Sequence, residues 1–308
     1  MLQLPTVSMR DAERDPDRAS RLVRQAFEEW GFVAVRDHQV PASSIQDCYE
    51  QAGSFFALPQ ETKDRYHVRG GAGQRGYTPF ASETGKGASA PDLKEFWHVG
   101  REPAPAGASS EAYPDNVWPE ELPAFRPALL TLYRQLEELG NQLLVLVARS
   151  LGLPSNDLVD RVRDGNSILR PLHYPPIENA AGAVRAAAHE DINVLTLLVG
   201  SEEPGLEILA RTGEWMPVAT LEGTIVCNVG DMLQRLTNRV LRSTTHRVVN
   251  PPPPWSERSR HSIPFFLHFA ADVRIEALPG CLGEREPEPP ITAHEYLEQR
   301  LRELGLRD

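Results

Sequence analysis

The spacing of apolar residues changes from a helical to an extended period along the chain. In the first half, apolar positions recur every three or four residues in several segments, which is the period of amphipathic helices. This spacing predicts a helix over residues 18–30 that ends at Gly31 and a long helix from about 120 to 150. From residue 167 onward, short apolar runs are separated by Gly, Pro and Asn. That pattern is typical of β strands, so the chain is expected to place helices first and a β core second.

Two further helices are expected at sequences that resemble a capping box. Ser43 and Gln46 stand three positions apart at the start of a second predicted helix. Thr292 and Glu295 have the same spacing at the start of a C-terminal helix, predicted over 291–304. In a capping box, the side chain of the residue before the helix accepts a hydrogen bond from the backbone amide of the third helical residue. The side chain of that third residue accepts a hydrogen bond from the backbone amide of the residue before the helix.

These elements together predict an α+β fold class. We expect a double-stranded β-helix (jelly-roll) core flanked by N-terminal helices, one long central helix and a C-terminal helix. Residues 1–118 are interpreted as an N-terminal helical and strand region packed on the core. Residues 119–308 are interpreted as the core with its closing helix, and the two parts as a single structural unit.

Composition excludes several classes of partner. The 32 Lys and Arg residues against 43 Asp and Glu give a net charge of −11, which argues against nucleic-acid binding. No apolar stretch approaches the length of a membrane span, and the N-terminus lacks the apolar region of a signal peptide. The three Cys are few and widely spaced, which favours a reducing compartment. We therefore expect a cytoplasmic protein without membrane or nucleic-acid partners, and a monomer is favoured.

Two histidines and one aspartate are spaced as ligands of a single metal ion. His189 and Asp191 stand two positions apart beside an apolar run, and on a strand such residues share a face while Glu190 points away. His246 follows Asp191 by 55 positions (246 − 191) and must reach the same metal from another strand. Two imidazoles and a carboxylate make a facial ligand set for non-haem Fe(II) with open positions.

A second pair, Arg260 and Ser262, repeats this two-residue spacing at the start of the next apolar strand. The guanidinium can pair with a carboxylate through two parallel hydrogen bonds, and the hydroxyl adds one more donor. A single H-x-D can arise by chance, and an isolated His189 would be explained equally well as a hydrogen-bonded strand residue. The order of H-x-D, a lone His and R-x-S favours metal chemistry with a carboxylate-bearing ligand.

With these residues, the chain resembles the isopenicillin N synthase-like family of Fe(II)- and 2-oxoglutarate-dependent oxygenases over nearly its whole length. The segments that carry the resemblance include E-E-W-G-F-V-A-V-R-D-H-Q-V-P (28–41), R-G-Y (75–77), K-E-F-W-H-V-G (94–100), L-H-Y-P-P (172–176) and N-V-G-D-M-L-Q-R-L-T-N (228–238). Leu172 stands where plant members commonly have Asn, which leaves the orientation of the proximal carboxylate of 2-oxoglutarate open.

The resemblance implies an enzyme that uses Fe(II), 2-oxoglutarate and dioxygen to oxidise, most commonly to hydroxylate, a C–H bond of a small polar molecule. Succinate and CO2 would be released. The implied roles are iron ligation by His189, Asp191 and His246, binding of the distal 2-oxoglutarate carboxylate by Arg260 and Ser262, and assistance at the co-substrate by Tyr174.

Five residues are candidates for the substrate pocket, namely Arg75, Tyr77, Glu95, Arg170 and Asn193. Asn193 has the strand parity of Asp191, and Arg170 has that of Tyr174, although a surface ion pair would explain Arg170 equally well. Arg75 and Tyr77 stand in a Gly-rich segment, 69–90, that is expected to cover the site mouth together with the C-terminal helix. The charges of Arg75, Glu95 and Arg170 indicate a small polar or carboxylate-bearing substrate.

Other functions remain open on the sequence alone. An Fe(II) oxidase or cyclase of the same fold would bind its substrate carboxylate at Arg260 and Ser262 and use no 2-oxoglutarate. A metal-binding sensor or scaffold would keep the His, Asp and His residues without catalysis. A zinc hydrolase would need a general base beside the metal, and Glu190 points away from it.

Overall fold

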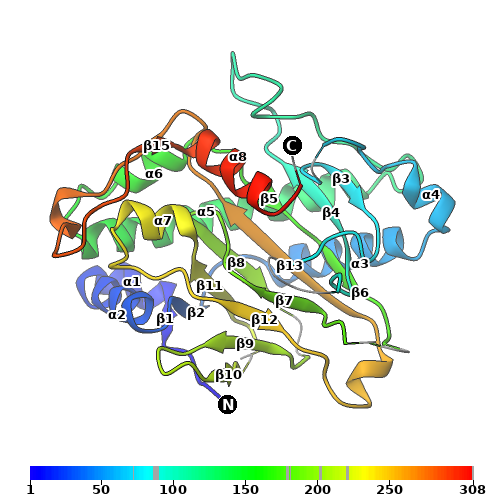
Figure 1. Ribbon diagram of the computed structural model, residues 1–308, viewed down its shortest axis with the longest axis horizontal. Helices are drawn as coiled ribbons and strands as arrows, with labels where there is room; N and C mark the ends of the chain where they lie inside the picture. The colour runs from blue at the N-terminus through cyan, green and yellow to red at the C-terminus, as the bar shows by residue number, and fades with distance from the viewer. Residues whose placement is uncertain are drawn as a thin grey trace.

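Two β sheets packed against each other form the centre of the molecule (Figure 1). The computed structural model describes residues 1–71, 73–85, 90–177, 180, 182–200, 203–219 and 222–306. Apolar side chains of β2 (Phe32–Arg36), β11 (Ile225–Val229) and β9 (Leu206–Leu209) pack between the sheets near the N-terminus, among them Phe32, Val226 and Ile208. This arrangement confirms the predicted jelly-roll core.

Within the described residues, the larger sheet has nine strands. Their order across the sheet is β1 (Thr6–Ser8), β2 (Phe32–Arg36), β11 (Ile225–Val229), β8 (Leu195–Val199), β13 (Arg260–Leu267), β5 (Ile168–Leu169), β4 (Glu95–Gly100) and β3 (Gly76–Thr78), with β6 (Leu172–Tyr174) pairing to β13 and β4. The smaller sheet has the order β10 (Trp215–Pro217), β9 (Leu206–Leu209), β12 (His246–Val248) and β7 (Ala186–His189). A separate hairpin pairs β14 (Arg274–Ile275) with β15 (Ile291–Thr292).

Helices cover the outer face of the larger sheet. The described helices are α1 (Met9–Arg14), α2 (Pro16–Glu29), α3 (Ala42–Phe56), α4 (Gln60–Asp64), α5 (Phe125–Ser150), α6 (Asp157–Val162), α7 (Asp231–Leu236) and α8 (Ala293–Glu303), with 3-10 turns at Trp255–Glu257 and Pro279–Cys281. The long helix α5 packs on β13, β8 and on helices α2 and α3, and it lies behind the sheets in Figure 1. The predicted helices over 18–30, 120–150 and 291–304 are therefore confirmed.

The N-terminal part of the chain belongs to the same core as the rest. Strands β1 to β4 all precede residue 118, and each is hydrogen-bonded into the larger sheet. One apolar cluster runs from α2 and α3 through α5 to β8 and β13. The residues before 118 therefore complete the sheet as well as cover it.

The two predicted capping boxes had different outcomes. At Thr292 the box is present, because the hydroxyl accepts from the Glu295 amide and the Glu295 carboxylate accepts from the Thr292 amide. The box at Ser43 and Gln46 is wrong, since α3 already begins at Ala42 and its start has no side-chain cap. Pro41 directly before this helix fixes the entry of the chain instead.

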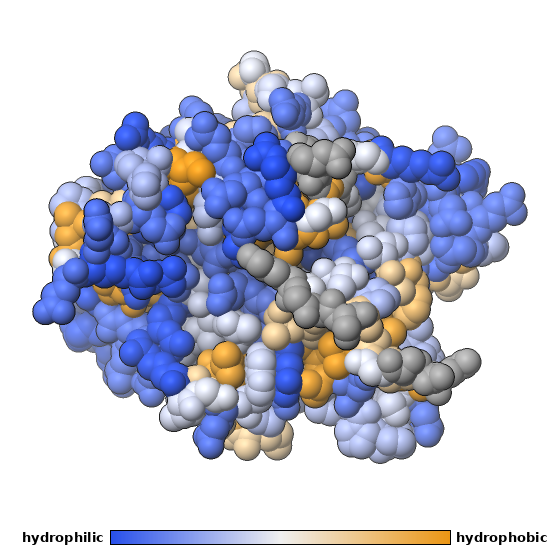
Figure 2. Space-filling view, viewed as in Figure 1, coloured by the Kyte–Doolittle hydropathy of each residue, from blue (hydrophilic) through white to orange (hydrophobic). Residues whose placement is uncertain are grey.

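The surface and the thiols give two further observations. Hydrophilic residues dominate the periphery of the face in Figure 2, and apolar patches lie toward its middle. No helix in the described part of the chain has the length and apolar character needed to cross a membrane. Cys48, Cys227 and Cys281 are all buried and free.

The end of α2 generates a prediction on stability. Gly31 follows the helix with φ +71°, and an added Cβ would lie 2.4 Å from the Arg242 carbonyl oxygen. Gly31→Ala should therefore reduce the free energy of unfolding by about 2–5 kcal/mol, from left-handed backbone strain plus overlap. Gly152 is a matched control, because its φ is +72° and an added Cβ would meet nothing within 4 Å. Gly152→Ala should cost only about 1–2 kcal/mol in urea unfolding, and equal losses at both sites would contradict the prediction.

Candidate metal centre

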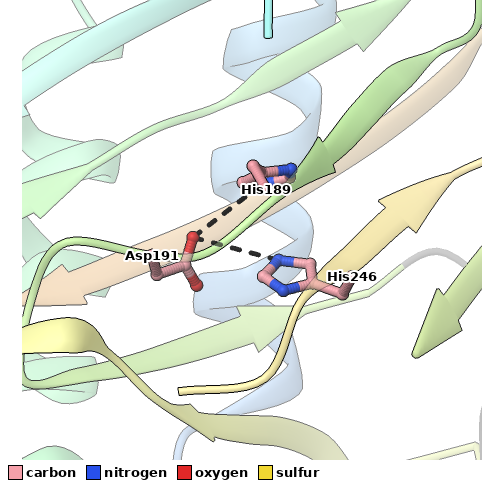
Figure 3. Close-up of side chains that lie close together, drawn as sticks. All are labelled: His189, Asp191 and His246. Atoms are coloured by element: carbon pink, nitrogen blue, oxygen red, sulfur yellow. Dashed lines mark ion pairs between the residues drawn. The ribbon is translucent and has the colours of Figure 1, made fainter. Parts of the chain in front are cut away.

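The predicted ligands His189, Asp191 and His246 come together at one end of the smaller sheet (Figure 3). Their ligand atoms all lie within 4.8 Å of one another. The Nε2 atom of each histidine is 3.9 Å from Oδ1 of Asp191. His189 and His246 are directly opposite each other on β7 and β12, so the antiparallel register itself pairs the two imidazoles.

Backbone carbonyls fix the ring orientation of both histidines. Nδ1 of His189 donates to the Ala187 carbonyl at 2.7 Å, and Nδ1 of His246 donates to the Thr244 carbonyl at 3.0 Å. A carbonyl only accepts, so each Nδ1 carries a proton, and in the neutral ring Nε2 keeps its lone pair. Both lone pairs are then available to a metal ion.

The Asp191 carboxylate has one oxygen held and one left for a metal. Oδ2 accepts from Thr196 Oγ1 at 2.6 Å and from Asn228 Nδ2 at 2.7 Å. Oδ1 is the atom that faces both imidazoles. The arrangement offers two neutral nitrogens and one anionic oxygen on one side, which suits a divalent metal with further open positions.

Electrostatics keep these groups in the states that a metal needs. Burial lowers the pKa of His189 to about 4, and the adjacent His246 ring contributes to this lowering, so His189 is neutral near pH 7. Its side chain remains 39% exposed and forms part of the cavity wall. Burial alone would raise the pKa of Asp191, but the two imidazoles and the bonds from Asn228 and Thr196 outweigh it and hold that pKa below its usual value.

The local structure around H-x-D differs from the expectation. His189 ends β7 of the smaller sheet, whereas the apolar strand β8 begins at Leu195 in the larger sheet. Asp191 therefore lies in the connection between the sheets, and its backbone carbonyl accepts from the Asp231 amide at 2.7 Å. The two side chains converge because the chain turns there, and strand alternation is not the cause.

Arg260, Ser262 and Tyr174 are buried together at the other predicted part of the site. Arg260 faces Tyr174 across β13 and β6, and its guanidinium lies 5.0 Å from the centre of the tyrosine ring. Nε and Nη1 of Arg260 are buried without a hydrogen-bond partner among the described residues. A buried guanidinium with free donors fits an incoming carboxylate.

A cavity of about 420 Å³ adjoins the metal ligands. His189 and Asp191 form part of its wall, together with His98, Arg170, Phe266 and other side chains. His246 and Arg260 are buried outside the described lining. The cavity therefore offers room for a small molecule beside the metal position.

Among the described residues of the cavity wall, Arg170 is a cation held mainly by aromatic rings. Its guanidinium lies 4.6 Å from the ring centre of Phe96 and 4.9 Å from that of Phe266. Its Nε donates to Nε2 of His98, whose pKa is well below the usual value because of burial and of Arg170 itself. Two phenyl rings and a neutral imidazole thus fix the guanidinium without neutralising it.

The other cations of the described lining have acidic partners. Lys94 Nζ lies 2.8 Å from Asp92 and 3.3 Å from Glu83. Arg300 of α8 lies 3.3 Å from Asp231. In this part of the chain, Arg170 is the lining cation with no carboxylate within ion-pair distance, so a substrate would have to supply one or another acceptor.

Three of the predicted pocket residues, Arg75, Tyr77 and Glu95, lie outside the described lining of this cavity. Glu95 is buried in a network with Lys63 Nζ at 2.8 Å, His173 Nδ1 at 2.7 Å and the Tyr77 hydroxyl. Tyr77 itself packs in the aromatic core under α3. Arg75 donates to the Pro114 and Gln74 carbonyls and to Asn166.

Both faces of β4 are buried, which is why strand parity could not select its inward side. His98 forms part of the cavity wall, and its ring centre lies 4.8 Å from that of Phe96. Asn193 does touch the cavity, but its amide is committed elsewhere. Its Nδ2 donates to the Leu195 carbonyl, and its Oδ1 accepts from Thr196.

Two segments that were expected to cover the site contribute residues to the cavity wall. Helix α8 contributes Leu297, Arg300 and Leu301 to the wall, as expected of a closing helix. Segment 69–90 contributes Glu83 and neighbouring residues, while residues 72 and 86–89 of the expected cover lie outside the described residues. Within the same segment β3 is a buried strand of the core.

Comparison with known families gives two matches along the chain. Residues 4–121 match the family described as non-haem dioxygenase in morphine synthesis N-terminal. Residues 165–269 match the 2OG-Fe(II) oxygenase superfamily, and this interval contains all six predicted metal and co-substrate residues.

Individual proteins agree with these matches. A 2-oxoglutarate-Fe(II) type oxidoreductase of Emericella nidulans is 32% identical, covering 89% of this chain and 81% of its own. The crystal structure of a 2OG-Fe(II) oxygenase family protein from Caulobacter crescentus is 47% identical with a TM-score of 0.88, covering 97% and 98% of the two chains. A Neurospora crassa protein crystallised in complex with alpha-KG and thymine is 27% identical with a TM-score of 0.85, covering 97% and 96%.

The hydrogen bonds to Asp191 generate a prediction on metal affinity. Asn228→Leu should lower the affinity for Mn(II) or Fe(II) by about 10–100-fold, because Oδ2 loses a donor that orients the carboxylate. Asn156→Leu, at an exposed position, is the control, and His246→Ala should abolish stoichiometric binding. Calorimetric titration of Mn(II) into each variant measures the effect. The prediction fails if the Asn228 and Asn156 variants bind Mn(II) equally well.

Proposed function

This chain belongs to the Fe(II)- and 2-oxoglutarate-dependent oxygenase family, and from that membership we propose which of its residues perform each part of the reaction. The protein is a 2-oxoglutarate-dependent dioxygenase that uses Fe(II), 2-oxoglutarate and dioxygen. The division of roles among named residues and the chemistry of the substrate are proposals.

We propose that His189, Asp191 and His246 hold the iron. The supporting observation is that two Nε2 lone pairs and one carboxylate oxygen converge, while Nδ1 and Oδ2 are already bonded to protein groups. Because the three ligands come from one side, the opposite positions stay open to exogenous oxygen ligands.

Arg260 and Ser262 are proposed to bind the distal carboxylate of 2-oxoglutarate, with Tyr174 beneath the guanidinium. The buried, unpartnered donors of Arg260 support this role. When bound, iron and 2-oxoglutarate supply the oxidising chemistry, in which 2-oxoglutarate, dioxygen and a C–H bond give succinate, CO2 and an alcohol. The chain's own contribution is to orient both carboxylates and to hold the reacting carbon away from bulk water.

The substrate is proposed to be a small molecule that presents a carboxylate or carbonyl oxygen to Arg170. The size of the cavity and the lack of an acidic partner for this guanidinium, among the described residues, support the proposal. The similar Neurospora crassa protein is described in complex with thymine, a small molecule. Phe266 and Ile168 would contact the apolar part of such a substrate.

Removal of the Arg260 guanidinium tests the proposed co-substrate site. A charge-assisted pair is worth about 1.5–3 kcal/mol, so Arg260→Met should raise the KM for 2-oxoglutarate by about 10–100-fold. Arg260→Lys should be intermediate, because an ammonium keeps the charge without the planar fork. The KM is measured from succinate formation. If the KM for 2-oxoglutarate is unchanged and the KM for the prime substrate rises instead, the oxidase alternative is the better description.

Arg170 is tested with a panel of small molecules that stimulate succinate formation. Carboxylates and cyclic imides should stimulate the wild-type protein more than analogues of the same size in which methylene groups replace the carboxylate or the imide carbonyl groups. Arg170→Met should lose that preference and leave the affinity for 2-oxoglutarate unchanged. Arg161→Met, which removes an ion pair on α6, is the control. An unchanged preference in Arg170→Met would contradict the proposed role.

A further inference from the structure

A second buried arginine lies beside the proposed 2-oxoglutarate site. Arg185 directly precedes β7, and its side chain is fully buried. Nη2 donates to the backbone carbonyls of Trp255 at 3.3 Å and Arg258 at 3.4 Å. Nε and Nη1 have no hydrogen-bond partner among the residues that the structure describes. A buried guanidinium with unused donors is costly unless another group completes its environment.

Arg185 and Arg260 share one aromatic ring. The Arg185 guanidinium lies 5.9 Å from the ring centre of Tyr174, and the Arg260 guanidinium lies 5.0 Å from it. Burial lowers the pKa of Arg185, and the charge of Arg260 lowers it further. A guanidinium nevertheless stays protonated in proteins, so two like charges are held close together in a buried region.

One acidic residue only partly offsets these charges. Oε2 of Glu203 lies 3.5 Å from Nη1 of Arg185. This Oε2 atom is itself buried and has no hydrogen-bond partner in the described part of the chain. Among the described residues, two guanidinium charges and one carboxylate leave a net charge of +1 (2 − 1) in this cluster. A single monoanionic group would neutralise the cluster, and the distal carboxylate of 2-oxoglutarate is such a group.

We propose that Arg185 is a second cation of the 2-oxoglutarate site. It would act as a positioning residue: from its place beside Tyr174, its positive charge would attract the distal carboxylate of 2-oxoglutarate. The carboxylate of Glu203 would partly offset that positive charge. The shared Tyr174 ring and the unused Nε and Nη1 donors support this placement. The inference rests on the proposed role of Arg260.

Binding measurements can separate this role from a purely structural one. Anaerobic, Fe(II)-loaded protein is titrated calorimetrically with 2-oxoglutarate and with 2-oxopentanoate, which has the same chain length but no distal carboxylate. Arg185→Met should raise the Kd for 2-oxoglutarate by about 3–10-fold and leave that for 2-oxopentanoate unchanged. Arg185→Lys should retain part of the affinity. Arg258→Met, at an exposed arginine nearby, is the control and should change neither Kd.

Glu203→Gln gives an effect of opposite sign. Loss of the carboxylate leaves Arg185 unneutralised, so the Kd for 2-oxoglutarate should fall by about threefold with no change for 2-oxopentanoate. Equal weakening of both ligands in Arg185→Met, or an unchanged 2-oxoglutarate Kd in Glu203→Gln, would overturn the inference. Arg260→Met is measured in parallel. If Arg260→Met weakens 2-oxoglutarate binding while Arg185→Met does not, only the inference on Arg185 fails. If neither variant weakens 2-oxoglutarate binding, the proposed co-substrate site fails as well.

Discussion

The carboxylate of Asp191 connects the two sheets on which the site depends. Asp191 follows β7 of the smaller sheet, whereas Thr196 and Asn228, which hold its Oδ2 atom, belong to β8 and β11 of the larger sheet. A buried carboxylate with one oxygen bonded twice cannot rotate freely, so Oδ1 stays directed at the imidazoles. The relative position of the sheets therefore sets the metal geometry, and the edge-on contact of Phe32 with the His246 ring supports the same alignment.

Much of the fold and the centre of the site could be predicted from local chemistry. The apolar period of α5 and the capping box of α8 are encoded within the segments themselves, and the ligand types at 189, 191 and 246 indicate a metal site before any geometry is known. The path of the chain through the ligands could not be predicted. H-x-D was expected on one strand, but it spans the end of β7 and the turn into another sheet, because side-chain type does not reveal where a short strand ends.

The substrate side was harder to predict because it depends on pairing between distant segments. Arg75, Lys94, Arg170 and Arg300 are equally charged in the sequence, yet three of them are satisfied by protein groups. Only the fold shows that Arg170 lies between phenyl rings without a carboxylate within ion-pair distance among its described neighbours. Glu95 was also a candidate for the pocket because of its charge. In the fold, Lys63 and His173 enclose its carboxylate on the other face of β4. Charge alone therefore could not distinguish a recognition group from an internal ion pair.

The placement of the three thiols has a consequence for the durability of the protein. Cys227 neighbours Asn228 on β11, but alternation directs it to the opposite face, among apolar side chains. Cys48 lies in the same apolar cluster, and burial raises the pKa of both thiols far above neutrality. The reactive thiolate is therefore scarce, and none of the three thiols belongs to the described lining of the cavity. Self-inactivation by sulfenic acid formation should accordingly be slow, which extends the number of cycles one molecule can complete.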